Sequence, residues 1–344
     1  MLNKEMKSML SPLNLMHNIL MFPKYRIKNN SIYPNRLKHF KINLLPICAT
    51  LILIYLFSIR IHSIHCSINS SLTSYLSVAY EFSAFTFSLI LNFIINVLYS
   101  RSNIYLVFKL QEVHRILSDN CFNYFVIWNW ISAVLVITVY ICITIFNSLI
   151  VQCPIKDLLY GFAFISFDIN YVYAIRLIQF LSRKVDIWNF RVQNLESFDN
   201  NEMQCKAMFQ CYLNILECYN LVKKSYQQLV SFTLMFCVFF PITTITSLYL
   251  WTTRSLVYQI LLSLFFEKFY IQMNNVQHNC AVLLQSNRTN AEKRLYKNIQ
   301  RLHRAMFHKL SARGMFYIDA TFPLKIMSSL NSHMIVLIQF AVLD

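Results

Sequence analysis

Long apolar segments alternate with polar segments along the whole chain. A helix needs about 20 mostly apolar residues to cross a bilayer. Seven stretches meet this need and predict spanning helices at about 43–60, 75–99, 124–151, 158–182, 226–251, 256–277 and 316–342. The predicted fold class is therefore an all-α membrane protein with seven transmembrane helices, since a helix satisfies its own backbone groups inside lipid.

The polar segments between the spans divide the chain further. The first 42 residues are basic and contain three prolines, so we expect an irregular start. Two later polar segments keep a helical periodicity and predict helical extensions beyond the membrane. The predicted organisation is an N-terminal segment at 1–42, helices one to four at 43–182, a helical linker at 183–225, helices five and six at 226–277, a basic helix at 278–315 and the last spanning helix at 316–344.

The last apolar segment carries a polar stripe along one side. At about 100° per residue, Ser328 and Ser332 fall within roughly 20° of Gln339 around the predicted helix. Lys325 falls at about 40° on the same side. A spanning helix with such a stripe usually faces a bundle interior or water. The alternative is that the serines bond to their own helix or join it to neighbouring helices.

The positive charges gather on one side of the predicted membrane. The chain has 31 Lys and Arg and a net charge of +16. Of these, 25 lie in the N-terminal segment and the segments after spans two, four and six, 3 lie in the other connecting segments, and 3 lie inside spans. The positive-inside rule therefore places the N-terminus in the cytosol and, with seven spans, the C-terminus outside. This distribution accounts for the charge without a nucleic-acid partner.

The sequence offers little for catalysis or metal binding. Hydrophobic residues make up 56% of the chain, and we find no nucleophile elbow, phosphate loop or metalloprotease motif, so we expect neither an enzyme nor a cofactor. Among the ten cysteines, no spacing is typical of a zinc site. Cys66 and Cys153 fall in predicted outside loops, where they could pair or stay free. Asn69 begins a glycosylation sequon in an outside loop.

Charges inside the spans are candidates for function, because a buried charge is costly without a partner. Glu81 lies in the outer half of the second span, and Asp168 lies in the middle of the fourth. With the nearby Tyr80 and Tyr171, they form our predicted ligand-binding set, since a pocket for a small organic molecule needs aromatic walls and a few polar groups. Each acid could equally pair with a neighbouring helix, and the aromatic residues could serve ordinary packing or an interfacial belt.

The end of the chain carries a recognisable sequence motif. Ser332–Phe340 reads SHMIVLIQF. It resembles the C-terminal signature of insect gustatory receptors, which is Thr-Tyr, five hydrophobic residues and Gln-Phe. The apolar spacer and the final pair match, whereas the first two residues, Ser and His, depart from the family's Thr and Tyr. Upstream, Gly314, Phe316 and Asp319 are similar to the family's Gly-x-Phe-x-x-Asp entry into the same helix.

The resemblance implies a ligand-gated, cation-permeable channel subunit that assembles as a tetramer. The last helix would line the pore, with the Gln-Phe pair at its constriction, and the polar helices at 183–225 and 278–315 would form a cytosolic anchor. We expect Lys325 to extend to the cytosolic interface or to pair with Asp319, because a fixed positive charge disfavours cations on the pore axis. The pore and gate residues implied are Ser328, Ser332, Ile335, Val336, Gln339 and Phe340.

The same resemblance implies the partners. They are a small-molecule tastant, permeant cations, membrane lipid and other gustatory receptor subunits in a homo- or hetero-tetramer, at the plasma membrane of gustatory sensory neurons. Two alternatives stay open: an accessory subunit that conducts only with partner subunits, and a G-protein-coupled receptor. The charge distribution opposes the second, whose N-terminus lies outside the cell. Sugars, bitter compounds, amino acids and carbon dioxide all remain possible ligand classes.

Overall fold

The computed structural model describes the chain in blocks. These are residues 2–20, 22–28, 30–34, 86–119, 122–150, 155–195, 201–239, 247–312, 314 and 316–343, with single positions between 48 and 83. The main helices are α1 (Lys4–Ile19), α4 (Ser100–Ile116), α5 (Phe122–Ile150), α6 (Ile155–Gln193), α7 (Asn201–Phe239), α8 (Ser247–Gln285), α9 (Asn290–Met306) and α10 (Phe322–Leu343). These residues are mostly helical, as the sequence predicted, with four short strands beside the helices.

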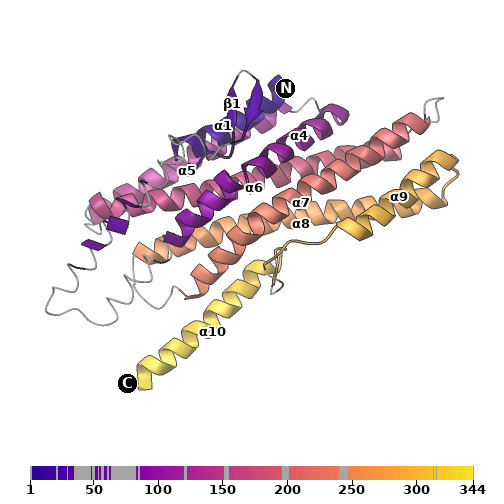
Figure 1. Cartoon of the computed structure of the whole chain (residues 1–344). Coiled ribbons are helices and arrows are strands. Elements are labelled where there is room, and N and C mark those ends of the chain that lie inside the picture. Colours follow the sequence, from indigo (N-terminus) through magenta and orange to yellow (C-terminus); the bar gives the residue numbers. More distant parts are fainter. Residues whose placement is uncertain are drawn as a thin grey trace.

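Long helices running along a common direction build the molecule (Figure 1). Helices α6, α7 and α8 have 39 residues each. At about 1.5 Å per residue, each is about 60 Å long, roughly twice the thickness of a bilayer's apolar core. The described residues of the predicted linker at 183–225 therefore belong to the end of α6 and the beginning of α7, on either side of residues 196–200, which lie outside the description. Polar residues after an apolar span lengthen these helices instead of ending them.

Two predicted span boundaries are wrong. The fifth span was expected at 226–251, but α7 ends at Phe239 and Trp251 lies inside α8. The last span was expected to begin at Phe316, but α10 begins at Phe322, with Pro323 in its first turn, where proline is tolerated. Residues Phe316–Tyr317 (β4) pair instead with Ser311–Ala312 (β3) in a hairpin. Gly314 lies in that turn at a φ of 79°, a conformation that favours glycine.

The described part of the N-terminal segment has regular structure where we expected an irregular chain. Helix α1 accommodates Pro12 and packs against α5 and α6. Its buried apolar residues recur three and four positions apart, as on one face of a helix: Met6, Met9, Leu10, Leu13 and Met16. A short antiparallel hairpin follows, formed by β1 (Arg26–Lys28) and β2 (Ser31–Tyr33). The expectation of an irregular start is therefore wrong for residues 4–19, because packing of this apolar face stabilises the helix despite Pro12.

The second predicted span does not end in a loop. After the helical residues 86–93, a π-helical segment, η1 (Ile94–Leu98), leads through Tyr99 directly into α4. The backbone N–H of Asn103 donates to the Tyr99 carbonyl at 2.9 Å, so the ladder resumes at once. Three basic residues that we had assigned to a loop therefore lie on a helix, at Arg101, Lys109 and Arg115.

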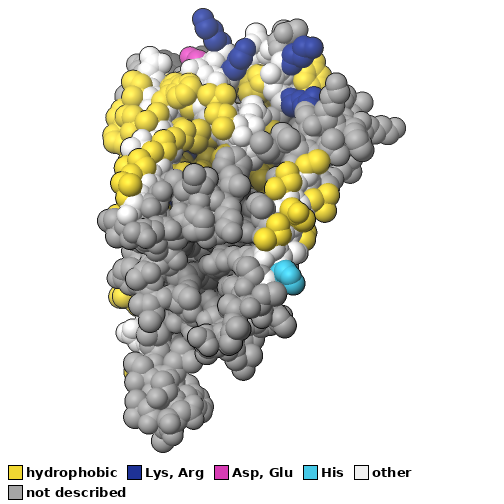
Figure 2. Space-filling view, turned by 90° about the vertical axis from the view of Figure 1, so that its left-hand side faces the viewer, with side chains coloured by type: hydrophobic (Ala, Val, Ile, Leu, Met, Phe, Trp, Pro, Cys, Tyr) yellow, Lys and Arg dark blue, Asp and Glu magenta, His cyan; other side chains and the backbone are white. Residues whose placement is uncertain are grey.

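One helix of the bundle is long, apolar and largely exposed. Among the described residues, one helix is long and apolar enough to cross a bilayer, Phe122–Ile143 in α5, with a mean hydropathy of 2.2. Only 17% of its most apolar window is buried, and Ile131, Val134 and Leu135 are 43%, 57% and 55% exposed. Figure 2 shows hydrophobic side chains over much of the described surface in view, with Lys and Arg at one edge. The count of seven spans stays a prediction.

Candidate functional site

The predicted ligand residue Asp168 is one half of a buried ion pair. Its Oδ2 lies 3.1 Å from Nε of Arg254, which comes from the first turns of α8. The two side chains are 8% and 10% exposed. We had placed Arg254 in an outside loop, so its pairing was missed. The sequence did offer a sign of this pairing, since Arg254 is the single charged residue in the predicted outside segment between spans five and six.

Tyr171 lies one helical turn from Asp168 on α6 and is 1% exposed. Its ring stacks on that of Tyr258 of α8, with centroids 6.3 Å apart and planes 20° apart. Because Arg254 and Tyr258 are also one turn apart, α6 and α8 meet through two successive contacts. The structure thus brings Asp168 and Tyr171 together on one face. Tyr80 and Glu81 lie outside the described residues.

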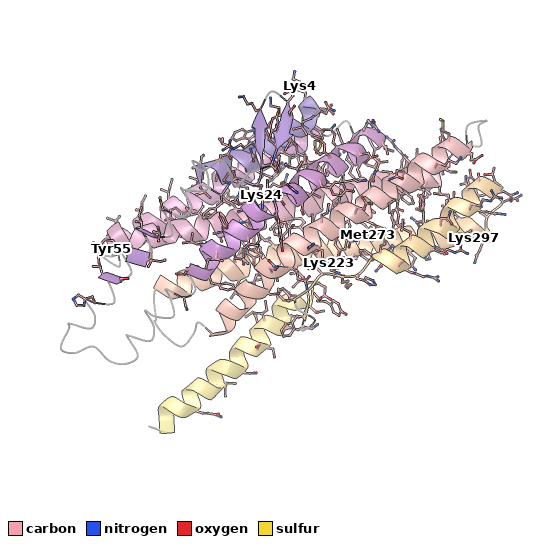
Figure 3. All side chains as sticks on the ribbon, in the orientation of Figure 1. Lys4, Lys24, Tyr55, Lys223, Met273 and Lys297 are labelled. Carbon is pink, nitrogen blue, oxygen red and sulfur yellow. The ribbon has the colours of Figure 1, made fainter. Side chains whose placement is uncertain are left out.

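A second buried polar centre was not foreseen from the sequence. Lys24 is 1% exposed, and its Nζ donates to Oδ1 of Asn96 at 2.6 Å and to Oδ1 of Asn170 at 2.8 Å. The same ammonium lies 4.9 Å and 5.5 Å from the ring centroids of Tyr173 and Tyr226. Figure 3 shows Lys24 among the helices, whereas Lys4 lies at the outer edge of the molecule. The signal in the sequence was a lysine beside Phe22, Pro23 and Tyr25, an apolar setting for a charge.

The last helix packs on the bundle only near its beginning. Phe322 and Ile326 are 1% and 3% exposed and face α7 and α8. Farther along, α10 diverges from these helices (Figure 1). Four of the predicted pore residues lie on its exposed side: Ser328, Ser332, Ile335 and Gln339. At about 100° per residue, Ile326 lies roughly 140° around the helix from Gln339, so the polar stripe faces away from the bundle that this chain forms. The side chains of Val336 and Phe340 lie outside the description.

Two details of α10 bear on the alternatives left open. The Ser332 hydroxyl donates to the Ser328 carbonyl at 3.0 Å, so this serine does bond to its own helix while it stays exposed. Asp319 forms its ion pair with Lys309, at 3.6 Å, and not with Lys325. Lys325 is exposed on the polar side. The expected pair with Asp319 within the chain is therefore wrong.

The polar extensions of the helices form a well-packed block around α9. Thr289 and Glu292 make a reciprocal capping box at the start of α9. Rings from three segments gather beside its end, where Tyr219 lies 5.1 Å from Phe269 and 5.4 Å from Phe307 between centroids. The Tyr219 hydroxyl also donates to the His308 carbonyl at 2.8 Å. These contacts fix α9 to α7 and α8 and so position the hairpin that leads into α10.

The cysteines in this block are buried free thiols, at Cys205, Cys211, Cys218 and Cys280. Burial raises the pKa of the Cys211 thiol to about 12, which keeps it protonated and poorly nucleophilic. The described residues include no group of three or more His, Cys, Asp or Glu that could hold a metal ion. Cys66 and Cys153, whose pairing we considered, lie outside the described residues.

The arrangement of the whole chain has a counterpart among solved structures. Insect olfactory receptor OR5 from Machilis hrabei superimposes with a TM-score of 0.68, over 96% of this chain and 97% of that one, at 14% identity. The chain has the fold of this olfactory receptor. The same receptor in complex with eugenol superimposes with a TM-score of 0.58, over 97% and 98% of the two chains, at 11% identity.

The likeness extends from end to end, so it includes the divergent last helix and the extended α6, α7 and α8. At 14% identity it establishes the fold alone. No family model matches the chain, and no curated protein matches its sequence. The C-terminal motif resembles that of an insect receptor family, and the solved structure that shares the fold is an insect olfactory receptor.

Proposed function

We propose that the chain is a subunit of a ligand-gated cation channel of the insect chemoreceptor type. The observation that carries this proposal is the last helix, which exposes its polar stripe away from its own bundle. One such helix cannot enclose water, whereas copies related by rotational symmetry can. The fold of an insect olfactory receptor over 96% of the chain supports the same conclusion.

In this proposal four subunits place α10 around a central axis. Ser328, Ser332 and Gln339 would line the water-filled pore, and Ile335 with Val336 would lie one turn below the constriction. Phe340 follows Gln339 by about 100°, so both cannot point at the axis together. A small rotation of α10 on opening would move Phe340 away and bring Gln339 closer, replacing an apolar constriction by an amide ring.

The proposed ligand is a small organic molecule bound in the outer half of the bundle. The olfactory receptor whose fold the chain shares has been solved with eugenol. Tyr80, Glu81, Asp168 and Tyr171 remain our ligand-binding candidates. Because Asp168 already pairs with Arg254, a ligand there would meet a charge pair and the stacked Tyr171 and Tyr258 rings, not a lone carboxylate.

The C-terminal motif favours a gustatory receptor within this group, at the plasma membrane of gustatory neurons. The charge distribution supports a cytosolic N-terminus and an outside C-terminus. Helix α9 and the extensions of α6, α7 and α8 would then lie in the cytosol as the anchor between subunits.

The decisive experiment combines current recording with cysteine substitution along α10. We expect currents evoked by a tastant in cells that express the chain. A charged thiol reagent should reduce them after Ser328→Cys, Ser332→Cys or Gln339→Cys. Ile326→Cys, which faces the bundle, and the parent chain with its ten native cysteines serve as controls.

Block at Ile326→Cys but at none of the three stripe positions would contradict the pore assignment. Currents that appear only after a second receptor is co-expressed would identify an accessory subunit instead of an autonomous channel.

A further inference from the structure

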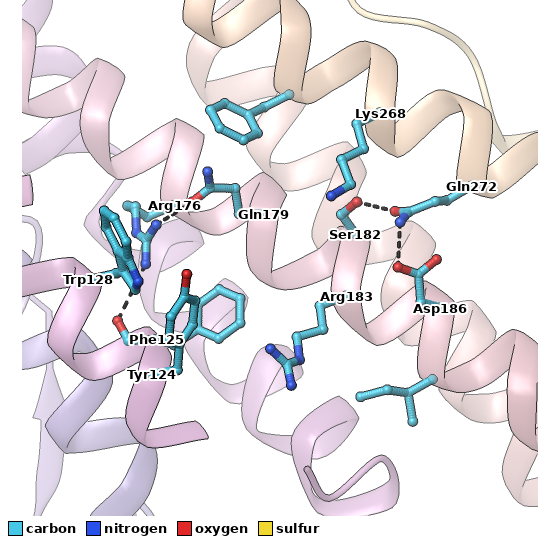
Figure 4. Close-up of a pocket in the computed structure, with 12 residues that line it drawn as sticks. Tyr124, Phe125, Trp128, Arg176, Gln179, Ser182, Arg183, Asp186, Lys268 and Gln272 are labelled. Carbon is cyan, nitrogen blue, oxygen red and sulfur yellow. Dashed lines mark hydrogen bonds between the residues drawn. The ribbon is translucent and has the colours of Figure 1, made fainter. Parts of the chain in front are cut away.

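A hollow of about 710 Å³ lies between α5, α6 and α8, away from the outer-half residues discussed above (Figure 4). Its α5 wall is aromatic and includes Phe125 and Trp128. Its α6 and α8 walls carry the cations Arg176, Arg183 and Lys268. Cζ of Arg176 and of Arg183 lie 5.5 Å and 5.6 Å from the centroid of the Phe125 ring, so aromatic and basic groups adjoin. This combination fits an amphipathic ligand with a negatively charged end.

The hollow lies where the apolar surface of α5 begins. Trp128 is 40% exposed at its edge, and the next exposed residues along α5 are Trp130 at 44% and Ile131 at 43%. Half-exposed tryptophan is typical of the membrane interface. In the other direction, α6 continues past Arg183 into its polar extension. In the orientation proposed above, the hollow therefore lies at the cytosolic face of the membrane.

The positive charges of the hollow are not all balanced within the chain. Arg183 pairs with Asp119, with Nε and Oδ2 2.5 Å apart. Arg176 instead donates to neutral groups, to Oδ1 of Asn129 at 2.6 Å and to Oε1 of Gln179 at 2.5 Å. Among the described residues, no carboxylate lies within 4.0 Å of Arg176 or Lys268.

One carboxylate, Asp186, lines the hollow against the three cations. It accepts a hydrogen bond from Nε2 of Gln272 at 2.5 Å. The Ser182 hydroxyl in turn donates a hydrogen bond to Oε1 of Gln272. This chain of bonds ties Asp186 to α8, where its charge acts on Lys268 without an ion pair within 4.0 Å, so the exposed Lys268 ammonium can still reach a ligand. A cation that has no counter-ion near lipid is costly, and a phosphate would remove that cost.

We propose that this hollow binds the phosphate headgroup of an anionic lipid from the cytosolic leaflet, with Lys268 and Arg176 as the phosphate ligands. The rings of Phe125 and Trp128 contact the glycerol and the first carbons of the acyl chains. Basic pockets between transmembrane helices on the cytosolic side are suited to such headgroups. The bound lipid joins α5 to α8 across the hollow. The inference rests on the proposed function only through the orientation of the chain.

The test measures lipid binding directly, so that it does not depend on conduction. The full chain is purified in detergent, and lipid retention is measured by native mass spectrometry with phosphatidylcholine, phosphatidylserine or a phosphatidylinositol phosphate. We expect the phosphatidylinositol phosphate to be retained over phosphatidylcholine. Lys268→Gln should weaken its binding about fivefold, since one basic residue near a charged membrane contributes on that scale.

Lys224→Gln is the matched control. Lys224 is also exposed and precedes the predicted fifth span, but it does not line the hollow. Its substitution should leave retention unchanged, and both variants should melt like the parent chain in phosphatidylcholine. Trp128→Ala should weaken retention of the lipid but not of its soluble inositol phosphate headgroup.

Three results would overturn the inference. One is equal retention of phosphatidylcholine and the anionic lipids. Another is an equal loss in Lys268→Gln and Lys224→Gln, which would indicate attraction by overall charge. The third is binding of inorganic phosphate or free inositol phosphate as tightly as the lipid, which would identify a soluble anion as the ligand. A chain that binds the lipid but never conducts would refute the channel proposal and leave this one standing.

Discussion

At the scale of single residues, the charges buried in this molecule hold segments together that are distant in the sequence. Lys24 connects the N-terminal segment to Asn96 of η1 and Asn170 of α6. Arg254 connects α8 to Asp168 of α6. A buried charge keeps its place only when partners satisfy it, so each of these residues fixes the packing of the elements around it.

Replacing Lys24 tests this role. Lys24→Met keeps the length of the side chain but removes the donor that bonds the side-chain carbonyl oxygens of Asn96 and Asn170. Leaving buried acceptors unsatisfied should lower the free energy of unfolding by about 1–3 kcal/mol. We expect the melting temperature of the detergent-solubilised protein to fall by several degrees. Lys28→Met is the control, because Lys28 is exposed on β1. An unchanged melting temperature in Lys24→Met would show that the ammonium contributes nothing to stability.

The proposed gate depends on two residues, Gln339 and Phe340. Phe340→Ala should produce basal current without ligand, because an apolar constriction closes a pore by excluding water. Gln339→Ala should change conductance or ion preference more than ligand sensitivity. Recordings from both variants, with Met327→Ala as an exposed control off the polar stripe, check this. If both reach the cell surface and behave like the parent chain, the gate lies elsewhere.

At the scale of elements, α9 is the part whose position depends most on side-chain contacts. Its His303 is 4% exposed, and the Tyr212 hydroxyl lies 2.6 Å from its Nδ1. Phe307 covers the same ring, with centroids 4.7 Å apart. A neutral imidazole can accept a hydrogen bond from the Tyr212 hydroxyl at Nδ1, whereas an imidazolium has no free nitrogen lone pair to accept it. Burial lowers the pKa of His303 to about 4, in agreement with the neutral form.

This depressed pKa predicts that α9 loosens in acid. The unfolded state takes up a proton near pH 6.5, well before the folded state does. The stability contributed by neutral His303 is therefore complete above about pH 6.5 and is lost as the pH falls toward 4, by at most about 3 kcal/mol. Melting temperatures measured across this range should fall more steeply for the parent chain than for His303→Gln.

The exposed His308 supplies the control for the acid effect. His308→Gln should keep the parent's pH dependence, because the His308 side chain is exposed and its substitution leaves the Tyr212–His303 contact in place. If His303→Gln and the parent chain lose stability in parallel between pH 6.5 and 4, the acid sensitivity arises from other groups.

At the scale of the whole molecule, the long helices separate an apolar belt from a polar block. α5 carries the most lipid-like surface, while α9 and the ends of α6, α7 and α8 form the polar block. The basic residues lie mainly on the segments of that block and on the N-terminal segment. Such an asymmetry fixes which side of a membrane each end of the molecule occupies.

Epitope tags test this orientation. A tag before Met1 should be labelled only after the cells are permeabilised, whereas a tag after Asp344 should be labelled on intact cells. Glycosidase treatment should shift the mobility of the protein through Asn69 alone, which an Asn69→Gln variant checks. Labelling of the N-terminal tag on intact cells would contradict both the topology and the channel proposal.

The sequence by itself determined the helical class, the polar stripe on the last helix and the C-terminal motif. Periodicity and charge are local properties, and a helix that must satisfy its backbone in lipid leaves little freedom in class. It therefore predicted that Ser328, Ser332 and Gln339 share one side of a helix. It also placed Asp168 and Tyr171 in one predicted ligand-binding set, though it did not predict what they contact.

Only the tertiary structure decided which distant groups meet. The pairing of Asp168 with Arg254, the burial of Lys24 and the hollow beside Lys268 each depend on two or three helices whose relative rotation no local pattern records. The predicted start of the last span failed for the same reason, since Phe316–Tyr317 pair with Ser311–Ala312 in a hairpin before α10 begins. Local pattern sets what a segment can become, and contacts between segments set where it ends and which of its charges are buried.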